Sequence, residues 1–319
     1  MKNKIVLALM QLKGISRKTI LKSFRLSSDM ECTIDVIAEA VDRAGMENGR
    51  VKKFSDLEIQ EAIEKADQII EDCQKNDIAI TTYLDKEYPK KLMTISDAPT
   101  ILYYKGDIQC LNELNSVAII GTRQPTDYGM RIAKNLGASF GKRSYVVVSG
   151  LALGCDTGGH EGCLEVNGKT VAVMAGGLDK VYPAKNKKLA ERILEQGGAL
   201  ISEYPPYTDA FKNFFVERDR LQSGLSDGVL VVETGEKGGT LHTAQYCLDY
   251  QRVLACYLHP EKYLHDEKTF GNQKLISEGK AMAVGNDAEL KAFRNKMEKQ
   301  DNDLMVEGVQ RTIFDFLDV

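Results

Sequence analysis

About a third of the way along the chain the sequence reads Ser116-Val117-Ala118-Ile119-Ile120-Gly121-Thr122-Arg123. A short apolar run that ends in glycine is typical of a buried strand followed by a tight turn. A helical pattern follows, with apolar residues at Ile132, Leu136 and Phe140. This stretch therefore predicts the first strand and helix of an α/β domain.

The same alternation of apolar runs and helical patterns continues downstream. The further runs are residues 145–150, 170–177, 199–203, 228–233 and 252–257. Short β-branched runs between helices predict right-handed βαβ units and a mostly parallel sheet, with helices on both faces. Ligands of such sheets bind beyond the carboxyl ends of the strands.

The regions on either side of this α/β part have different residue patterns. Residues 1–110 predict a small, largely helical N-terminal region that ends in short extended segments, with the clearest helical spacing at 56–76. Residues 111–286 hold the predicted sheet. Residues 287–319 predict a charged, helical C-terminal tail.

Composition excludes several classes of protein. The 319 residues are 43% hydrophobic and 28% charged, as in ordinary globular proteins. No apolar run approaches the roughly 20 residues that span a bilayer, and the short run near the N-terminus has no small-residue cleavage site. We therefore expect a cytoplasmic protein without membrane partners. The net charge of −4 still allows a local basic groove.

Cysteine and histidine spacing indicates neither a disulfide framework nor a metal site. The seven cysteines are scattered singly, and their odd number argues against closed pairing. The four histidines lie far apart, without metal-ligand spacing. We expect no metal and no organic cofactor.

Two strand ends carry residues that could contact a ligand, and the first of them suits a phosphate. Gly121, Thr122 and Arg123 place backbone N–H groups, a hydroxyl and a guanidinium at a helix start, although a tight turn with a surface arginine gives the same pattern. Ser149 and Gly150 precede Asp156 and His160. A Ser-His-Asp catalytic set is conceivable there, but a helix cap with a buried polar partner fits the pattern better.

Three further motifs combine glycine, charge and aromatic rings. Residues 175–189 hold paired glycines, a tyrosine and four lysines, the ingredients of a single-strand site or of a solvated helix start. Residues 214–220 hold two phenylalanines beside two arginines, which could also form salt bridges. Residues 233–244 offer a glycine-rich anion nest that opens a helix.

In combination and in order these motifs resemble the DNA processing protein A (DprA/Smf) family. The likeness spans roughly Pro99 to Ala283 and includes Gly-Thr-Arg, Ser-Gly-Leu-Ala-x-Gly-x-Asp, Gly-Gly-Leu-Asp-x-x-Tyr-Pro, Arg-x-Arg-Leu-x-x-Gly-Leu-Ser and Gly-Gly-Thr-Leu-x-Thr-Ala. The turn at residues 12–16 also resembles the helix-hairpin-helix-like or SAM-like domain often fused upstream.

The resemblance implies an extended Rossmann-like fold that binds single-stranded DNA without sequence specificity. It also implies a homodimer and the loading of a RecA-type recombinase during DNA uptake and recombination (natural transformation, or competence), with no catalysis. Carried onto this sequence, the expected nucleic-acid-binding residues are Gly121, Thr122, Arg123, Ser149, Gly150, Gly176, Gly177, Lys180, Tyr182, Asn186, Arg218, Arg220, Gly238, Gly239 and Thr240.

This sequence departs from the family pattern in four places. These departures affect the expected partner interactions more than the expected fold. Asp219 stands where asparagine is usual, His259-Pro260 where Pro-Gly is usual, and Phe270-Gly271 where Ser-Gly is usual. The tail is too short for the winged-helix domain of many members. A divergent member that acts in defence against mobile elements is therefore a second hypothesis for the biological role.

The main rival is a nucleotide-binding protein of the same Rossmann superfamily. The LOG-like phosphoribohydrolases carry Pro-Gly-Gly-x-Gly-Thr-x-x-Glu at the position of residues 237–244. Here Leu241 and Ala244 cannot supply acid or base chemistry. A small-nucleotide sensor without chemistry and a pure protein scaffold are two further hypotheses.

Overall fold

The structure is a computed structural model that describes residues 2–16, 20, 31–48 and 52–300. The end of the predicted tail, residues 301–319, lies outside the described residues.

A nine-stranded sheet forms the centre of the molecule, in the order β1-β2-β6-β5-β4-β3-β7-β8-β9. The six strands predicted from the apolar runs all belong to it, and they pair in parallel with one another. The strands are β1 (Ala79–Thr82), β2 (Ile101–Gly106), β3 (Ser116–Ile120), β4 (Val146–Ser149), β5 (Thr170–Val173), β6 (Ala199–Ser202), β7 (Gly228–Val231), β8 (Val253–Tyr257) and β9 (Met282–Val284).

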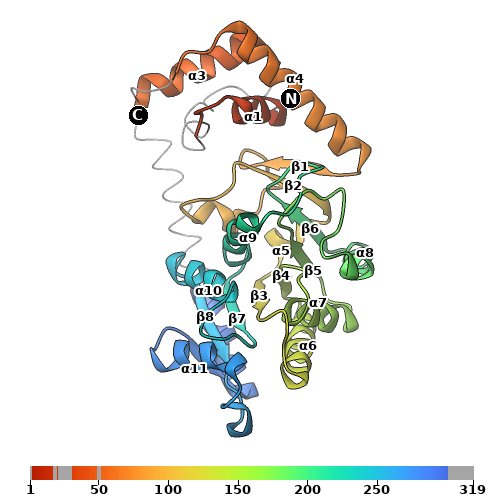
Figure 1. The fold of residues 1–319 in the computed structure, drawn as a ribbon, viewed down its shortest axis with the longest axis vertical. Coiled ribbons are helices and arrows are strands. Elements are labelled where there is room, and N and C mark those ends of the chain that lie inside the picture. Colours follow the sequence, from red (N-terminus) through yellow and green to blue (C-terminus); the bar gives the residue numbers. More distant parts are fainter. Residues whose placement is uncertain (1, 17–19, 21–30, 49–51, 301–319) are drawn as a thin grey trace.

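Helices cover both faces of this sheet, as Figure 1 shows. They are α1 (Lys2–Gln11), α3 (Ile34–Asn48), α4 (Asp56–Lys75), α5 (Cys110–Glu113), α6 (Asp127–Gly141), α7 (Cys155–Glu165), α8 (Lys187–Glu195), α9 (Lys212–Gly224), α10 (Thr240–Asp249) and α11 (Phe270–Ser277), and residues 287–300 are also helical. Side chains of α6, α7 and the 287–300 helix pack on one face of the central strands. Those of α9, α10 and α11 pack on the other. The predicted Rossmann-like α/β fold is therefore confirmed.

The N-terminal helices pack together at one end of the sheet (Figure 1). Helix α4 begins with a capping box, in which the Ser55 side chain accepts from the Glu58 N–H and Glu58 accepts from the Ser55 N–H. Strands β1 and β2 lie within the predicted N-terminal region but join the large sheet, because β2 pairs antiparallel with β6. The domain boundaries at residues 110 and 286 stay predictions. No described helix is long and apolar enough to cross a membrane.

The order of the strands positions the site. Strand β3 has β4 on one side, whereas the chain returns to its other side only with β7. This reversal creates a crevice beyond the carboxyl end of β3, where open α/β sheets bind their ligands.

Candidate functional site

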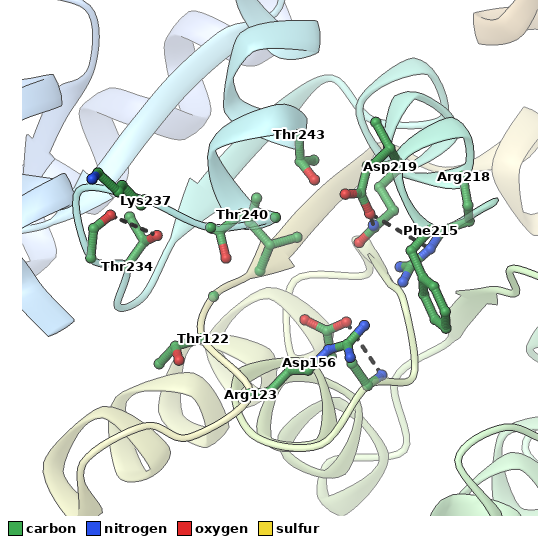
Figure 2. Close-up of a pocket in the computed structure, with 18 residues that line it drawn as sticks. Thr122, Arg123, Asp156, Phe215, Arg218, Asp219, Thr234, Lys237, Thr240 and Thr243 are labelled. Carbon is green, nitrogen blue, oxygen red and sulfur yellow. Dashed lines mark hydrogen bonds and ion pairs between the residues drawn. The ribbon is translucent and has the colours of Figure 1, made fainter. Parts of the chain in front are cut away.

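A pocket of about 410 Å³ opens at this crevice (Figure 2). Four segments line it: the loop after β3, the first turn of α7, one side of α9, and the glycine-rich loop that leads into α10. Seven of the residues expected from the sequence take part. They are Gly121, Thr122, Arg123, Arg218, Gly238, Gly239 and Thr240.

The loop after β3 is held by the loop that follows the neighbouring strand β7. The Thr122 N–H donates to the Glu233 carbonyl at 2.7 Å. The side chain of Arg123 extends across the pocket, and its guanidinium carbon lies 4.9 Å from the centroid of the Phe215 ring. This is a cation–π contact between the β3 loop and α9.

Glu233 anchors the same loop through its side chain, a role that sequence reasoning missed. Its fully buried carboxylate accepts from the Thr126 N–H at 2.8 Å and from the Thr126 hydroxyl at 2.6 Å. The His259 Nε2 lies 3.5 Å away. Burial acts to raise the pKa of Glu233, but its contacts with His259 and Thr126 outweigh burial and lower this pKa. Because Thr126 also caps α6, Glu233 joins the loop after β7 to the start of that helix.

Three buried polar residues of α9 form the α9 wall of the pocket: Arg218, Asp219 and Gln222. The Gln222 amide donates to Asp219 Oδ1 at 3.0 Å. The Arg218 Nε lies 3.6 Å from the same oxygen. Burial raises the pKa of Asp219 to about 6, although Arg218 attracts the charged form.

The Arg218 guanidinium occupies the space above Gly150. A Cβ at that glycine would lie 1.5 Å from Arg218 Nη1, so a side chain there would displace the guanidinium. Asp156 lies beside them, and its carboxylate accepts from the Gly150 N–H at 3.0 Å. Burial raises the pKa of Asp156, against the attraction of Arg218.

The conceivable Ser-His-Asp catalytic set does not assemble. The Ser149 hydroxyl donates to the Ile119 carbonyl at 2.7 Å. The His160 Nδ1 lies 2.6 Å from the Thr170 hydroxyl, and burial lowers the pKa of His160 to about 3; His160 does not line the pocket. The Ser149 hydroxyl therefore joins β4 to β3, and His160 joins α7 to β5.

A second, shallow hollow of about 20 Å³ lies next to the pocket. Gly150, Gly176, Gly177, Lys180 and Tyr182 from the expected set line it, together with Phe215. Lys180 pairs with Asp209 at its edge, and the Tyr182 ring is 54% exposed. Because Phe215 also lines the larger pocket, its ring forms the border between the two hollows.

Arg220 and Asn186 line neither hollow. The Arg220 guanidinium binds the Glu203 carboxylate at 2.5 Å and the Asp97 carbonyl at 2.9 Å. Two residues along a helix turn by about 200°, so Arg220 leaves α9 on the side opposite Arg218. The Asn186 amide donates to the Leu151 carbonyl at 2.8 Å. Arg220 therefore forms a salt bridge and does not line the pocket.

The opposite wall belongs to the glycine-rich loop and the start of α10. Gly238 has a φ of +146°, which side-chain-bearing residues rarely adopt. Thr240 begins the ten-residue helix α10. Thr243 lies about one turn further along this helix, and both side chains line the pocket (Figure 2). Backbone N–H groups at such a helix start favour an anion. Among the described residues, no group of three or more His, Cys, Asp or Glu side chains could hold a metal ion.

Together, the sheet order and the pocket define a Rossmann-like α/β protein with a mixed acidic and basic ligand pocket at the point where the strand order reverses. The profile of the family described as DNA recombination-mediator protein A matches residues 79–294, and the chain belongs to this family.

The matches to known relatives cover different shares of the length of each relative. The DNA processing protein DprA of Bacillus subtilis is 34% identical over 75% of this chain and 78% of its own. Protein Smf of Synechocystis is 38% identical over 58% of this chain, but this spans only 47% of that protein.

Two solved structures share the fold. The DprA structure from Streptococcus pneumoniae matches with a TM-score of 0.74, at 29% identity, over 92% of this chain and 98% of that one. A DprA structure from Helicobacter pylori, described in terms of its single-stranded DNA binding mode, matches with a TM-score of 0.59, at 29% identity, over 71% of this chain and 96% of that one.

Proposed function

We propose that this protein binds single-stranded DNA across the pocket and the hollow beside it. The observation that carries the proposal is the pairing of Arg123 with Phe215 at their border, which places a cation and a stacking surface at one point. The description of the Helicobacter pylori relative supports this choice of ligand.

In this mechanism charge and stacking supply most of the affinity. A strand phosphate would meet Arg123, the N–H groups at the start of α10, or Lys180 after it leaves Asp209. Bases would stack on Phe215 and Tyr182, whose ring centroids are 5.8 Å apart. Neither kind of contact depends on base sequence.

We propose binding without catalysis. The buried carboxyl of Asp156 accepts backbone hydrogen bonds, and His160 does not line the pocket. Residues 237–244, where the phosphoribohydrolase motif would lie, include no aspartate or glutamate. Homodimer formation and RecA loading stay proposals that rest on the family resemblance, and a cytoplasmic location stays a proposal that rests on the sequence composition.

A nucleotide sensor is the second candidate. A pocket of about 410 Å³ with a helix start at one wall is large enough for a mononucleotide, which such a site would bind through its single phosphate.

Competition binding separates these candidates. The probe is a fluorescent oligo-dT, measured by anisotropy at increasing salt, with unlabelled oligo-dT, duplex DNA and AMP as competitors. We expect oligo-dT alone to compete at low concentration, with a log–log salt slope of about −0.7 per phosphate contacted. Displacement by AMP at a similar concentration would instead favour the nucleotide sensor, and absence of strand binding would refute the proposal.

A further inference from the structure

The α9 wall presents polar atoms without partners. Among the described residues, the buried Gln222 Oε1 and the buried Nε and Nη1 of Arg218 have no hydrogen-bond partner. Gln222 is 2% exposed and Arg218 is 4% exposed, and both line the pocket. Buried polar groups are normally satisfied, and a ligand in the pocket that these residues line could supply the missing partners.

Asp219 lies between these two residues. Its Oδ1 contacts Gln222 Nε2 at 3.0 Å and lies 3.6 Å from Arg218 Nε. Its Oδ2 faces the opposite wall, 3.9 Å from the position of a Cβ on Gly239. Figure 2 shows Arg218 and Asp219 side by side on α9, with Thr240 and Thr243 on α10 opposite them.

The orientation of the Gln222 amide follows from Asp219. An amide turned the other way would place its oxygen against a carboxylate oxygen, which repels it, so the nitrogen faces Asp219 and the oxygen is left over. Along the wall the groups are then a donor from Arg218, an acceptor from Asp219 and an acceptor from Gln222.

This order complements one base. The Watson–Crick edge of guanine presents an acceptor (O6) followed by two donors (N1–H and N2–H). Thymine has one donor between two acceptors, adenine has a single amino donor beside an acceptor, and cytosine repeats the order of the wall itself. We propose that Arg218, Asp219 and Gln222 read the Watson–Crick edge of a guanine, so that this protein prefers guanine at one position of a bound nucleotide or strand.

The inference rests on the proposed function and adds a base preference to contacts that otherwise ignore sequence. It also gives a role to Asp219, the acid that stands where the family usually has asparagine. An asparagine there would accept from Gln222 through its oxygen and turn its NH₂ group toward the pocket, which would replace the acceptor by a donor.

The test compares labelled oligo-dT strands that carry one dG, dA, dC, deoxyinosine or 7-deaza-dG at the centre. At pH 8, well above the pKa of Asp219, we expect dG to bind about tenfold more tightly than dA, dC or dT, the size of a good edge contact. Deoxyinosine lacks the N2 amino group and should lose much of this preference. The 7-deaza-dG strand keeps the Watson–Crick edge and should retain it.

Variants assign the preference to the wall. We expect Asp219→Asn and Gln222→Met to bring the dG-to-dT affinity ratio close to one. Gln245→Met removes an exposed amide of α10 that bonds Asp249 and should keep the wild-type ratio. Circular dichroism confirms that each variant is folded. Equal affinity of the wild type for all strands would overturn the inference and leave the proposed function intact.

A mononucleotide measurement keeps the two proposals separable. Calorimetry with dGMP, dAMP, dCMP and dTMP tests the same wall without a strand. If no strand binds, the proposed function fails, but a dGMP preference lost in Asp219→Asn still supports the inference. If no strand binds and dGMP binds no better than the other three, the inference is wrong as well.

Discussion

The guanidinium carbon of Arg123 lies 4.9 Å from the centroid of the Phe215 ring. Arg123 follows β3, Phe215 belongs to α9, and their contact spans the site from one segment to the other. The two residues therefore link the larger pocket to the hollow that contains Lys180 and Tyr182.

Removing the arginine should weaken strand binding and its dependence on salt. We expect Arg123→Ala to lower the affinity for oligo-dT by about tenfold or more, because a desolvated phosphate contact and a cation–π contact are lost. Its log–log salt slope should be smaller by about 0.7. Anisotropy titrations at several salt concentrations measure both quantities.

The matched control is Arg131→Ala. Arg131 lies over the Tyr128 ring at 5.8 Å on α6, but it lines neither hollow. It should leave affinity and slope unchanged. An equal effect of both substitutions would show that overall charge, rather than the pocket, governs binding.

Phe215 should contribute by stacking rather than by charge. Phe215→Leu keeps an apolar side chain but removes the ring, and we expect it to cost about 1–3 kcal/mol of binding free energy with an unchanged salt slope. Phe215→Tyr keeps the ring and should bind like the wild type. A changed slope in Phe215→Leu would instead indicate that Arg123 has lost its position.

Arg220 should matter for stability. Arg220→Ala leaves the Glu203 side chain, which is only 19% exposed, without its cationic partner, and we expect the free energy of unfolding to fall by about 2–4 kcal/mol. Urea denaturation measures this loss. Oligo-dT affinity of the folded fraction should stay at the wild-type level, because the side chain lies outside both hollows; a clear loss of affinity would contradict that assignment.

The pH dependence of stability should report on Asp219. Its folded pKa is about 6, above the 3.8 of the free side chain, so the folded state takes up the proton first as pH falls. This group therefore destabilises the fold above pH 6, and its cost disappears as pH falls from about 6 to below about 4. Asp219→Asn should be more stable than the wild type by up to about 3 kcal/mol at pH 7 to 8.

The difference between the two proteins isolates this residue, because contributions common to both cancel. Urea denaturation at pH 4, 5, 6, 7 and 8 should show the advantage of Asp219→Asn shrinking toward zero at the acid end. A constant difference across this range would mean that the Asp219 carboxyl titrates with an ordinary pKa in the folded state.

Local sequence was sufficient for the six parallel strands and for the loop at residues 121–123. Short apolar runs rich in β-branched residues and separated by helical patterns favour strands over helices. The joining of β1 and β2 to the same sheet was not predictable in this way, because it depends on antiparallel pairing with β6, almost a hundred residues later.

The roles of the side chains show the same division between what local sequence determines and what the tertiary structure determines. The sequence by itself determined an α/β fold, a glycine-rich crevice and the residue types that a phosphate needs, because strand periodicity and turn chemistry are local. Only the tertiary structure decided that Arg218 faces the pocket while Arg220 faces Glu203, and that Asp219 and Gln222 share one wall. Helix rotation and burial settle which neighbour each side chain meets, and those neighbours come from distant parts of the chain.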